Sequence, residues 1–167
     1  MQIRFIYGDK TRKNYWLPAI FEILHANMDE IIPSGRTYEE DYAEWFSNVS
    51  PALEKVPRQI ILMYDEEELI GFFQYYVNEG ASLFMMEEIQ LRRGYQGTGI
   101  FRGLYAWLLP QLPSDLRTVE AYAHKKNARS RRILDHLGLK PMSEDAAGEI
   151  DHFRGDFSAL FAHYVPR

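Results

Sequence analysis

The sequence contains no cysteine. This absence excludes disulfide bonds, thiolate nucleophiles and zinc sites built on cysteine. No apolar run approaches the roughly 20 residues that a membrane-spanning helix needs. The first residues, 1–7, are too few and too polar to form a signal peptide. We therefore expect a cytoplasmic protein that does not act at a membrane.

The sequence also has no excess of basic residues, because it contains 19 Lys and Arg but 24 Asp and Glu, which gives a formal net charge of −5. A nucleic-acid-binding protein needs a basic face to displace counterions, so we expect no nucleic-acid partner. The five histidines show no metal-ligand spacing, and we predict no metal site. The charge is compatible with an enzyme that acts on neutral or cationic small molecules.

The chain has 167 residues, of which 46% are hydrophobic, enough for one core and one domain spanning residues 1–167. Residues 2–7 alternate weakly and predict a first strand. Thr37 and Glu40 have the spacing of a capping box, which predicts the start of a second helix, and Pro51 and Pro57 bracket a break behind it. The first helix is predicted by apolar residues at helical spacing, namely Leu17, Ile20, Phe21, Leu24 and Met28.

After the break the spacing of apolar residues is first that of strands. Further along the chain, segments with strand spacing and segments with helix spacing follow one another. We predict strands at 59–64, 69–77, 81–91 and 118–123, and helices at 100–108 and 130–137. The tail is predicted to contain two further strands, at 139–142 and 150–153, and then a last apolar segment at 157–164. Gly138 is predicted to end the second of these helices as its C-cap. The element order β-α-α-β-β-β-α-β-α-β predicts an α/β (α+β) fold with a central mixed, mostly antiparallel sheet and helices on both faces.

The stretch from Glu87 to Phe101 carries the strongest chemical signal, because a strand leads through a glycine-containing loop into a helix. Such a loop exposes backbone N–H groups at a helix N-terminus, where the helix dipole also favours a phosphate. Gly97 and Gly99 would let a ligand approach the backbone closely, and Arg92 and Arg93 add positive charge. The alternative is an ordinary strand–turn–helix connection that binds nothing.

A second motif begins about thirty residues later. Asn127 opens a helix that ends in Leu137-Gly138-Leu139, with Ser130 in its first turn. On its own, Asn127 is explained as an N-cap whose side-chain oxygen accepts a backbone N–H.

Together the two motifs resemble those of the GCN5-related N-acetyltransferase (GNAT) family. Gln96, Gly97 and Gly99 match the positions of the family's phosphate-binding loop. Asn127 and Ser130 match the positions of the family's later motif. The resemblance implies two splayed parallel strands, 81–91 and 118–123, with acetyl-CoA as co-substrate between them. It implies that the pantetheine pairs with the backbone of Ile89, Gln90 and Leu91, as an added strand does. It also implies that the pyrophosphate rests on the N–H groups of Gln96, Gly97, Thr98, Gly99, Ile100 and Phe101.

The resemblance further implies that Asn127 contacts the pantetheine or a nearby backbone group, and that Ser130 or a neighbouring Arg contacts the outer phosphates. Two positions depart from the family pattern. Phe101 replaces a Gly or Ala, and its ring either narrows the approach to the pyrophosphate or points into the core. Leu134 replaces a Tyr that protonates the leaving thiolate in many members, so Tyr122 and His124 become substitute candidates. Tyr122 is equally compatible with a packed strand aromatic.

Glu87 and Glu88 are the best candidates for the general base, because the resemblance places an acidic pair at this strand end in members that acetylate polyamines. A carboxylate in an apolar cleft has a raised pKa, which suits a base near neutral pH. Successive strand side chains point to opposite faces, so we expect one of the two to reach the acceptor. The alternative is a solvated acidic pair at a strand edge.

We therefore predict an acyltransferase, an acetyl-CoA-dependent N-acetyltransferase that transfers the acetyl group to a primary amine of a small molecule or peptide by direct attack. Residues 28–46, which are rich in acidic side chains, and Tyr75 and Tyr76 would line the acceptor. The alternative is a non-catalytic acyl-CoA-binding sensor or interaction module on the same fold. An unrelated α/β phosphate-binding domain is a third alternative, and a homodimer stays open.

Overall fold

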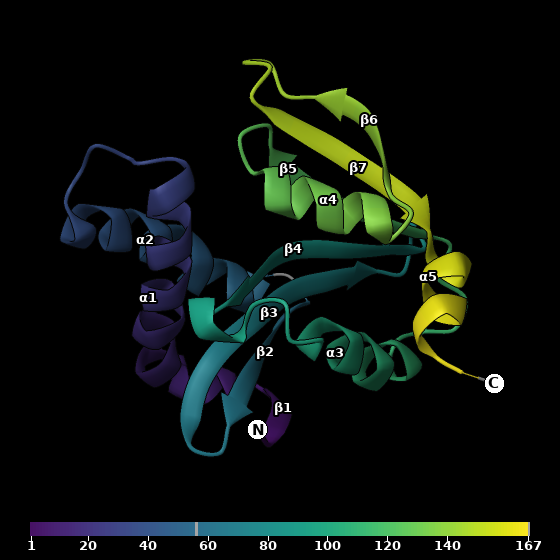
Figure 1. Cartoon of the computed structure of the whole chain (residues 1–167), viewed down its shortest axis with the longest axis horizontal. Coiled ribbons are helices and arrows are strands. Elements are labelled where there is room, and N and C mark those ends of the chain that lie inside the picture. The colour runs from purple at the N-terminus through teal and green to yellow at the C-terminus, as the bar shows by residue number, and fades with distance from the viewer. Residues whose placement is uncertain (56, 167) are drawn as a thin grey trace. The chain divides into compact units, whose positions relative to one another are not determined.

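The computed structural model describes residues 1–55 and 57–166, which include a seven-stranded mixed sheet with strand order β1-β2-β3-β4-β5-β7-β6 (Figure 1). The strands are β1 (Ile3–Tyr7), β2 (Arg58–Asp65), β3 (Glu68–Asn78), β4 (Leu83–Leu91), β5 (Thr118–His124), β6 (Lys140–Glu144) and β7 (Ile150–Asp156). The helices are α1 (Lys13–Ile31), α2 (Tyr38–Lys55), α3 (Ile100–Leu108), α4 (Ala128–His136) and α5 (Phe157–Tyr164). The predicted fold class, a mixed α/β sheet with helices, is confirmed.

The chain divides into two compact units. The first comprises Met1–Tyr75 and Glu88–Thr98, and the second comprises Tyr76–Glu87 and Gly99–Arg167. Among the described residues, none of the helices combines the length and the apolar character needed to cross a membrane.

In the first unit, α1 and α2 bury an apolar cluster together with β2 and β3. Its buried members are Trp16, Leu17, Ile20, Leu53, Ile60, Leu62 and Phe72. The predicted capping box at the start of α2 is confirmed, since the Glu40 N–H donates to Thr37 Oγ1 (3.2 Å) and the Thr37 N–H donates to Glu40 Oε2 (3.1 Å). These reciprocal bonds satisfy backbone donors that a helix start leaves unpaired.

The break predicted between Pro51 and Pro57 begins later than the sequence suggests. Helix α2 runs through Pro51 and ends at Lys55, and Val56 lies outside the described residues. A proline inside a helix removes one hydrogen bond and crowds the preceding turn. Ser50 and Leu53, on either side of it, are buried, so packing against the first unit's core holds the turn in place despite this cost.

In the second unit, the tail forms two strands as predicted, with β7 between β5 and β6, and residues 157–164 form the helix α5. Asp156 caps this helix by accepting the Ser158 N–H at 3.0 Å. Aromatic contacts join α5 to its neighbours. Phe157 meets Phe84 edge-to-face with ring centroids 6.0 Å apart, and Tyr164 lies 4.9 Å from Tyr105 of α3.

Strands β4 and β5 form a parallel pair. Their register runs from Leu83 opposite Thr118 to Met86 opposite Ala121. Beyond Met86, β4 continues to Leu91, and beyond Ala121, β5 continues to His124. The strand predicted at 81–91 begins two residues too early, because Ala81 and Ser82 belong to the turn before β4, where Ser82 has a φ of 52°.

Gly71 of β3 is a position in the first unit where a side chain is poorly tolerated. A Cβ there would lie 2.4 Å from the Gln90 carbonyl oxygen and 2.7 Å from Leu91 Cδ2. We expect Gly71→Ala to lower the free energy of unfolding by about 1–3 kcal/mol, the usual cost of overpacking. Gly80→Ala is the matched control, because its Cβ would meet Asn78 Oδ1 at 3.5 Å, an ordinary contact. Urea unfolding of both variants checks this, and equal stability would contradict the close β3–β4 approach.

Candidate functional site

The connection between β4 and α3 is built around two glycines in the left-handed region, Gly97 (φ 75°) and Gly99 (φ 81°). A Cβ at either position would meet no atom within 4 Å among the described residues, so open space adjoins both. Gly99 precedes the first residue of α3 and provides no side-chain cap. The first N–H groups of α3 therefore keep the donors that a bound anion would need.

Side chains of the first unit hold the beginning of this connection. The Tyr95 hydroxyl donates to Oδ2 of Asp65, the last residue of β2, at 2.9 Å, and Thr98 Oγ1 donates to the Tyr95 carbonyl oxygen. The Gln96 side chain donates to the Leu91 carbonyl oxygen at 3.1 Å. The bond to Asp65 raises the pKa of Tyr95 to about 12. The loop is thus anchored at both Tyr95 and Gln96.

The charges of Arg92 and Arg93 are offset by carboxylates of the same unit. Arg92 lies 3.1 Å from Glu22 and donates to the Leu69 carbonyl oxygen at 2.8 Å. Arg93 lies 3.1 Å from Glu30. These two residues add less positive charge to the loop than the sequence suggests.

The end of β4 presents its backbone in the way that strand alternation requires. The Arg92 N–H donates to the Ile70 carbonyl oxygen at 2.7 Å, on the β3 side. Alternation therefore directs the backbone groups of Leu91 and Ile89 to the other edge of β4. There the Leu91 carbonyl oxygen accepts both the Gln96 and the Asn27 side chains, and the Leu91 N–H points to the same edge.

The two acidic candidates of β4, Glu87 and Glu88, are both half-buried. Glu88 accepts a hydrogen bond from the Gln90 side chain at 2.6 Å, and Gln90 is buried and accepts one from Asn27 of α1 at 2.9 Å. Asn27 was not among the site residues predicted from the sequence. The pattern that could have revealed it is its spacing, because Asn27 is a polar residue on the same face of the helix as the buried Ile20 and Ile23.

In the second unit, Asn127 is the N-cap of α4, since its Oδ1 accepts the Ser130 N–H at 3.1 Å. Its side chain is buried, and Nδ2 makes no hydrogen bond to any residue that the structure describes. The capping role is confirmed, and the side-chain NH2 group is left over for a ligand. Gly138, with a φ of 85°, follows the C-terminus of α4 as predicted.

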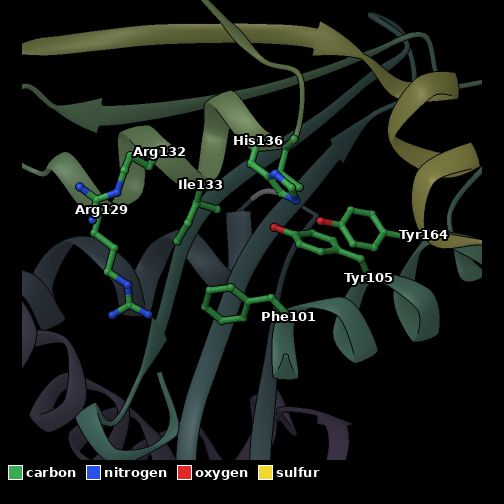
Figure 2. A pocket seen from close by; sticks show the side chains of 8 residues that line it. Phe101, Tyr105, Arg129, Arg132, Ile133, His136 and Tyr164 are labelled. Carbon is green, nitrogen blue, oxygen red and sulfur yellow. The ribbon is translucent and has the colours of Figure 1, made fainter. Parts of the chain in front are cut away.

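A cavity of about 270 Å³ lies between α3, α4 and α5 (Figure 2). Phe101 and Tyr105 come from α3, Arg129 and Arg132 from α4, and Tyr164 from α5; the other lining residues are Ile133, His136 and Leu137. Burial and the neighbouring Arg132 lower the pKa of Arg129. Neither guanidinium pairs with a carboxylate of the described residues, so the cavity carries uncompensated positive charge.

The sequence left open whether the Phe101 ring points into the core. The side chain is half-buried and lines this cavity. Its ring lies toward Ile133 of α4 in Figure 2, and does not insert into the core. Leu134, in contrast, is buried at 7% exposure and is part of the core. The side chain at this position therefore offers no acid.

Tyr122 is 57% exposed and stacks on His152, with ring centroids 4.7 Å apart. His152 Nε2 lies 2.7 Å from Glu120, a carboxylate whose side chain is only 9% exposed. Arg131 of α4 contacts Asp151 and the Phe153 ring, which alternate with His152 along β7. Tyr122 therefore lies on the sheet face opposite α4 and away from Asn127 and Ser130. The sequence did not reveal the pairing of Glu120 with His152, because it depends on the β5–β7 register.

A second cavity, of about 200 Å³, lies in the first unit between α1 and the residues leading into α2. It is lined by Phe21, Leu24, His25, Met28, Asp29, Ile32, Ser34 and Asp41, most of which fall in the predicted substrate wall. Ser34 and Arg36 bond Asp41 and lower its pKa, and Arg36 also pairs with Glu44. The negative charge facing this cavity is smaller than the acidic sequence suggests. Within the described ranges, we find no group of three or more potential metal ligands.

Comparisons with known proteins agree with this architecture. The profile of the acetyltransferase (GNAT) family matches residues 17–139. An acetyltransferase from Thermus thermophilus superposes with a TM-score of 0.72 at 15% identity, covering 93% of this chain and 97% of that one. PaiA N-acetyltransferase from Thermoplasma acidophilum, in complex with coenzyme A, superposes with a TM-score of 0.69 at 15% identity, over 93% and 99% of the two chains.

The spermidine N-acetyltransferase from Vibrio cholerae, in a dodecameric structure, superposes with a TM-score of 0.64 at 14% identity, over 97% of this chain and 98% of that one. At these identities the structural likeness establishes the fold. A search of curated proteins finds no significant match to the sequence.

The anchor at Tyr95 makes stability depend on pH in a defined direction. The Gln2 N–H and then the Tyr95 hydroxyl lower the pKa of Asp65 from its usual 3.8. Because the bonds favour the ionised carboxylate, their stabilisation is present above about pH 4 and is lost as pH falls through the lowered pKa. We expect Tyr95→Phe to be less stable than the parent at pH 6, by a margin that narrows toward pH 3.

Urea unfolding of both proteins across this pH range measures the margin. Tyr15→Phe is the control, because Tyr15 is 77% exposed and its ring contact with Arg12 survives the change. A margin that stays constant with pH would show that Tyr95 does not act on the ionised Asp65.

Proposed function

Because the chain belongs to the acetyltransferase (GNAT) family, we propose that it transfers an acetyl group from acetyl-CoA to a primary amine. The observation that carries this proposal is the loop from Gln96 to Phe101. It combines two left-handed glycines, adjoining open space and a helix start without a side-chain cap. These are the features that let backbone N–H groups approach a pyrophosphate.

The residues present fit acetyl-CoA at three further places. The remaining amide donor of Asn127, Nδ2, supports a contact with a pantetheine carbonyl. The guanidinium groups of Arg129 and Arg132 support a site for the outer phosphates, with Phe101 and Tyr105 providing apolar ring surface beside them. Ser130 lies in the first turn of α4, in the same region, and its hydroxyl is a further donor for these phosphates.

Acetyl-CoA supplies a thioester that a neutral amine can attack directly, and the chain has no cysteine to carry an acetyl group. In this mechanism Glu87 or Glu88 takes the proton from the acceptor ammonium. The Leu91 N–H, which points to the edge of β4 away from β3, donates to the acetyl oxygen and stabilises the charge that develops there. Tyr122, which is exposed on the sheet face opposite α4, is the candidate for returning a proton to the leaving sulfur.

The acceptor is a small molecule or peptide with a primary amine. The cavity between α1 and the residues leading into α2 supports this assignment through its apolar floor of Phe21, Leu24 and Met28 and the carboxylate of Asp29. Asp29 makes no ion pair within the described part of the chain, unlike Asp41. We further propose that residues 1–167 act as a single acetyl-CoA-binding domain.

Incubation with acetyl-CoA and a panel of primary amines, with free thiol as the readout, tests the proposal. We expect thiol release that depends on both the amine and the enzyme. Retained CoA binding without amine-dependent release from any panel member would favour a non-catalytic acyl-CoA-binding module instead.

Valine at Gly97 or Gly99 should weaken CoA binding at least tenfold, which is about 1.4 kcal/mol. The side chain would fill the open space beside the loop and would also be strained at the positive φ. Gly148→Val is the matched control, because Gly148 has a similar φ of 71° but lies in the β6–β7 turn. Isothermal titration calorimetry measures the affinity, and an unchanged affinity in both loop variants would refute the loop assignment.

Replacing the base should impair the chemical step. Glutamine keeps the shape of Glu87 or Glu88 but accepts no proton, so one of the two variants should lose roughly 10²–10⁴ in kcat at pH 7 while the other loses little. The deficit should shrink as pH rises, because more acceptor amine is then already neutral. Steady-state rates with a true acceptor between pH 6 and pH 9 check this. Parent-like rates in both variants at pH 7 would transfer the base role to another group or to solvent.

A further inference from the structure

A chain of amide groups links helix α1 to one of the two candidate bases. Asn27 Nδ2 lies 2.8 Å from the Leu91 carbonyl oxygen and 2.9 Å from Gln90 Oε1, and Gln90 Nε2 lies 2.6 Å from Glu88 Oε1. All of these residues belong to the first unit. Asn27 is therefore in a position to influence Glu88, although the two residues lie far apart in the sequence.

The donor and acceptor atoms in this series of hydrogen bonds follow from the chemistry of the groups. A backbone carbonyl only accepts hydrogen bonds, so the Asn27 atom facing Leu91 must be its amide nitrogen. The same nitrogen faces Gln90, so the Gln90 atom opposite must be the carbonyl oxygen. The Gln90 nitrogen is then turned toward Glu88, where it donates to the carboxylate.

Because the Gln90 side chain is buried, its amide group is held in this one orientation. Gln90 is 9% exposed, and reversing its amide would bring its oxygen against the Glu88 carboxylate and its nitrogen against the Asn27 nitrogen. Both contacts would be repulsive, and water has little access to replace them. Asn27 thus selects one orientation of Gln90, and Gln90 holds Glu88 as a charged acceptor in one position.

Building on the proposed acetyl transfer, we propose that Asn27 and Gln90 are positioning residues that orient Glu88, and that Glu88 is the base. Gln90 donates to Oε1 of Glu88 and so holds the carboxylate in the position from which it takes the acceptor's proton. A base held in one geometry avoids the loss of rate that even a 1 Å misplacement causes.

The Leu91 carbonyl oxygen ties the same asparagine to the cofactor loop, because Gln96 donates to it as well. When Asn27 is removed, the Gln96 bond to Leu91 remains. The loss of Asn27 should therefore act on the chemical step through Glu88 and leave acetyl-CoA binding nearly intact.

The test compares Asn27→Ala, Gln90→Leu and the control Asn14→Ala in the parent and in a Glu88→Gln background. Asn14 lies on the same helix, is exposed, and makes no contact with the described residues that would link it to β4. In the parent background we expect Asn27→Ala and Gln90→Leu to lower kcat by roughly 10- to 100-fold, with the KM for acetyl-CoA nearly unchanged. In the Glu88→Gln background both effects should vanish, and Asn14→Ala should change nothing in either background.

Equal losses of kcat in the two backgrounds would overturn the proposal, since a general structural role does not depend on Glu88. So would a large loss in Glu87→Gln with parent-like rates in Glu88→Gln, a result that leaves the proposed acetyl transfer standing.

A spectroscopic readout separates failure of this inference from failure of the proposed function. The side-chain amide resonances of Gln90 in ¹H–¹⁵N spectra should shift in both Asn27→Ala and Glu88→Gln, whether or not the protein turns over an amine. Shifts without any amine-dependent thiol release would retain the Asn27–Gln90–Glu88 network and refute the acetyl transfer. Unshifted resonances in an active enzyme would refute the network alone.

Discussion

The start of helix α3 determines how the rest of the site can work. A helix start leaves backbone N–H groups without partners, and α2, α4 and α5 satisfy some of them with the side chains of Thr37, Asn127 and Asp156. Helix α3 begins instead after Gly99, whose left-handed backbone offers no side chain. Its donors therefore stay available for an anion, and the proposed binding of acetyl-CoA rests on these donors together with the open space beside Gly97 and Gly99.

Contacts within the first unit anchor the beginning of this loop. Tyr95 is bonded to Asp65, Gln96 to Leu91, and Arg92 to Leu69 and Glu22, so the strand end and the loop share one set of contacts. The same strand end carries Glu88 and its amide neighbours. A loop and a carboxylate that are fixed by one network suit a reaction in which cofactor and acceptor must meet in a defined geometry.

Features that depend on nearby residues could be predicted from the sequence. The capping box at Thr37 and the left-handed glycine after α4, Gly138, follow from local spacing. The parallel pairing of residues 83–86 with 118–121 was expected only from the family resemblance. The early break at Pro51 was wrong, because tertiary packing around Leu53 outweighs the local cost of a proline. Contacts across long separations were not predictable, including Asn27 with Gln90 and His152 with Glu120, since no periodicity encodes which strands or helices meet.

Hydrogen–deuterium exchange with and without CoA tests the central claim most directly, because it reports on the backbone N–H groups themselves. Peptides covering residues 96–102 should exchange more slowly when CoA is present, and those covering the β1 and β2 strands should not change. Protection confined to other parts of the chain, with residues 96–102 exchanging at the same rate in both samples, would contradict the claim that the start of α3 holds the pyrophosphate.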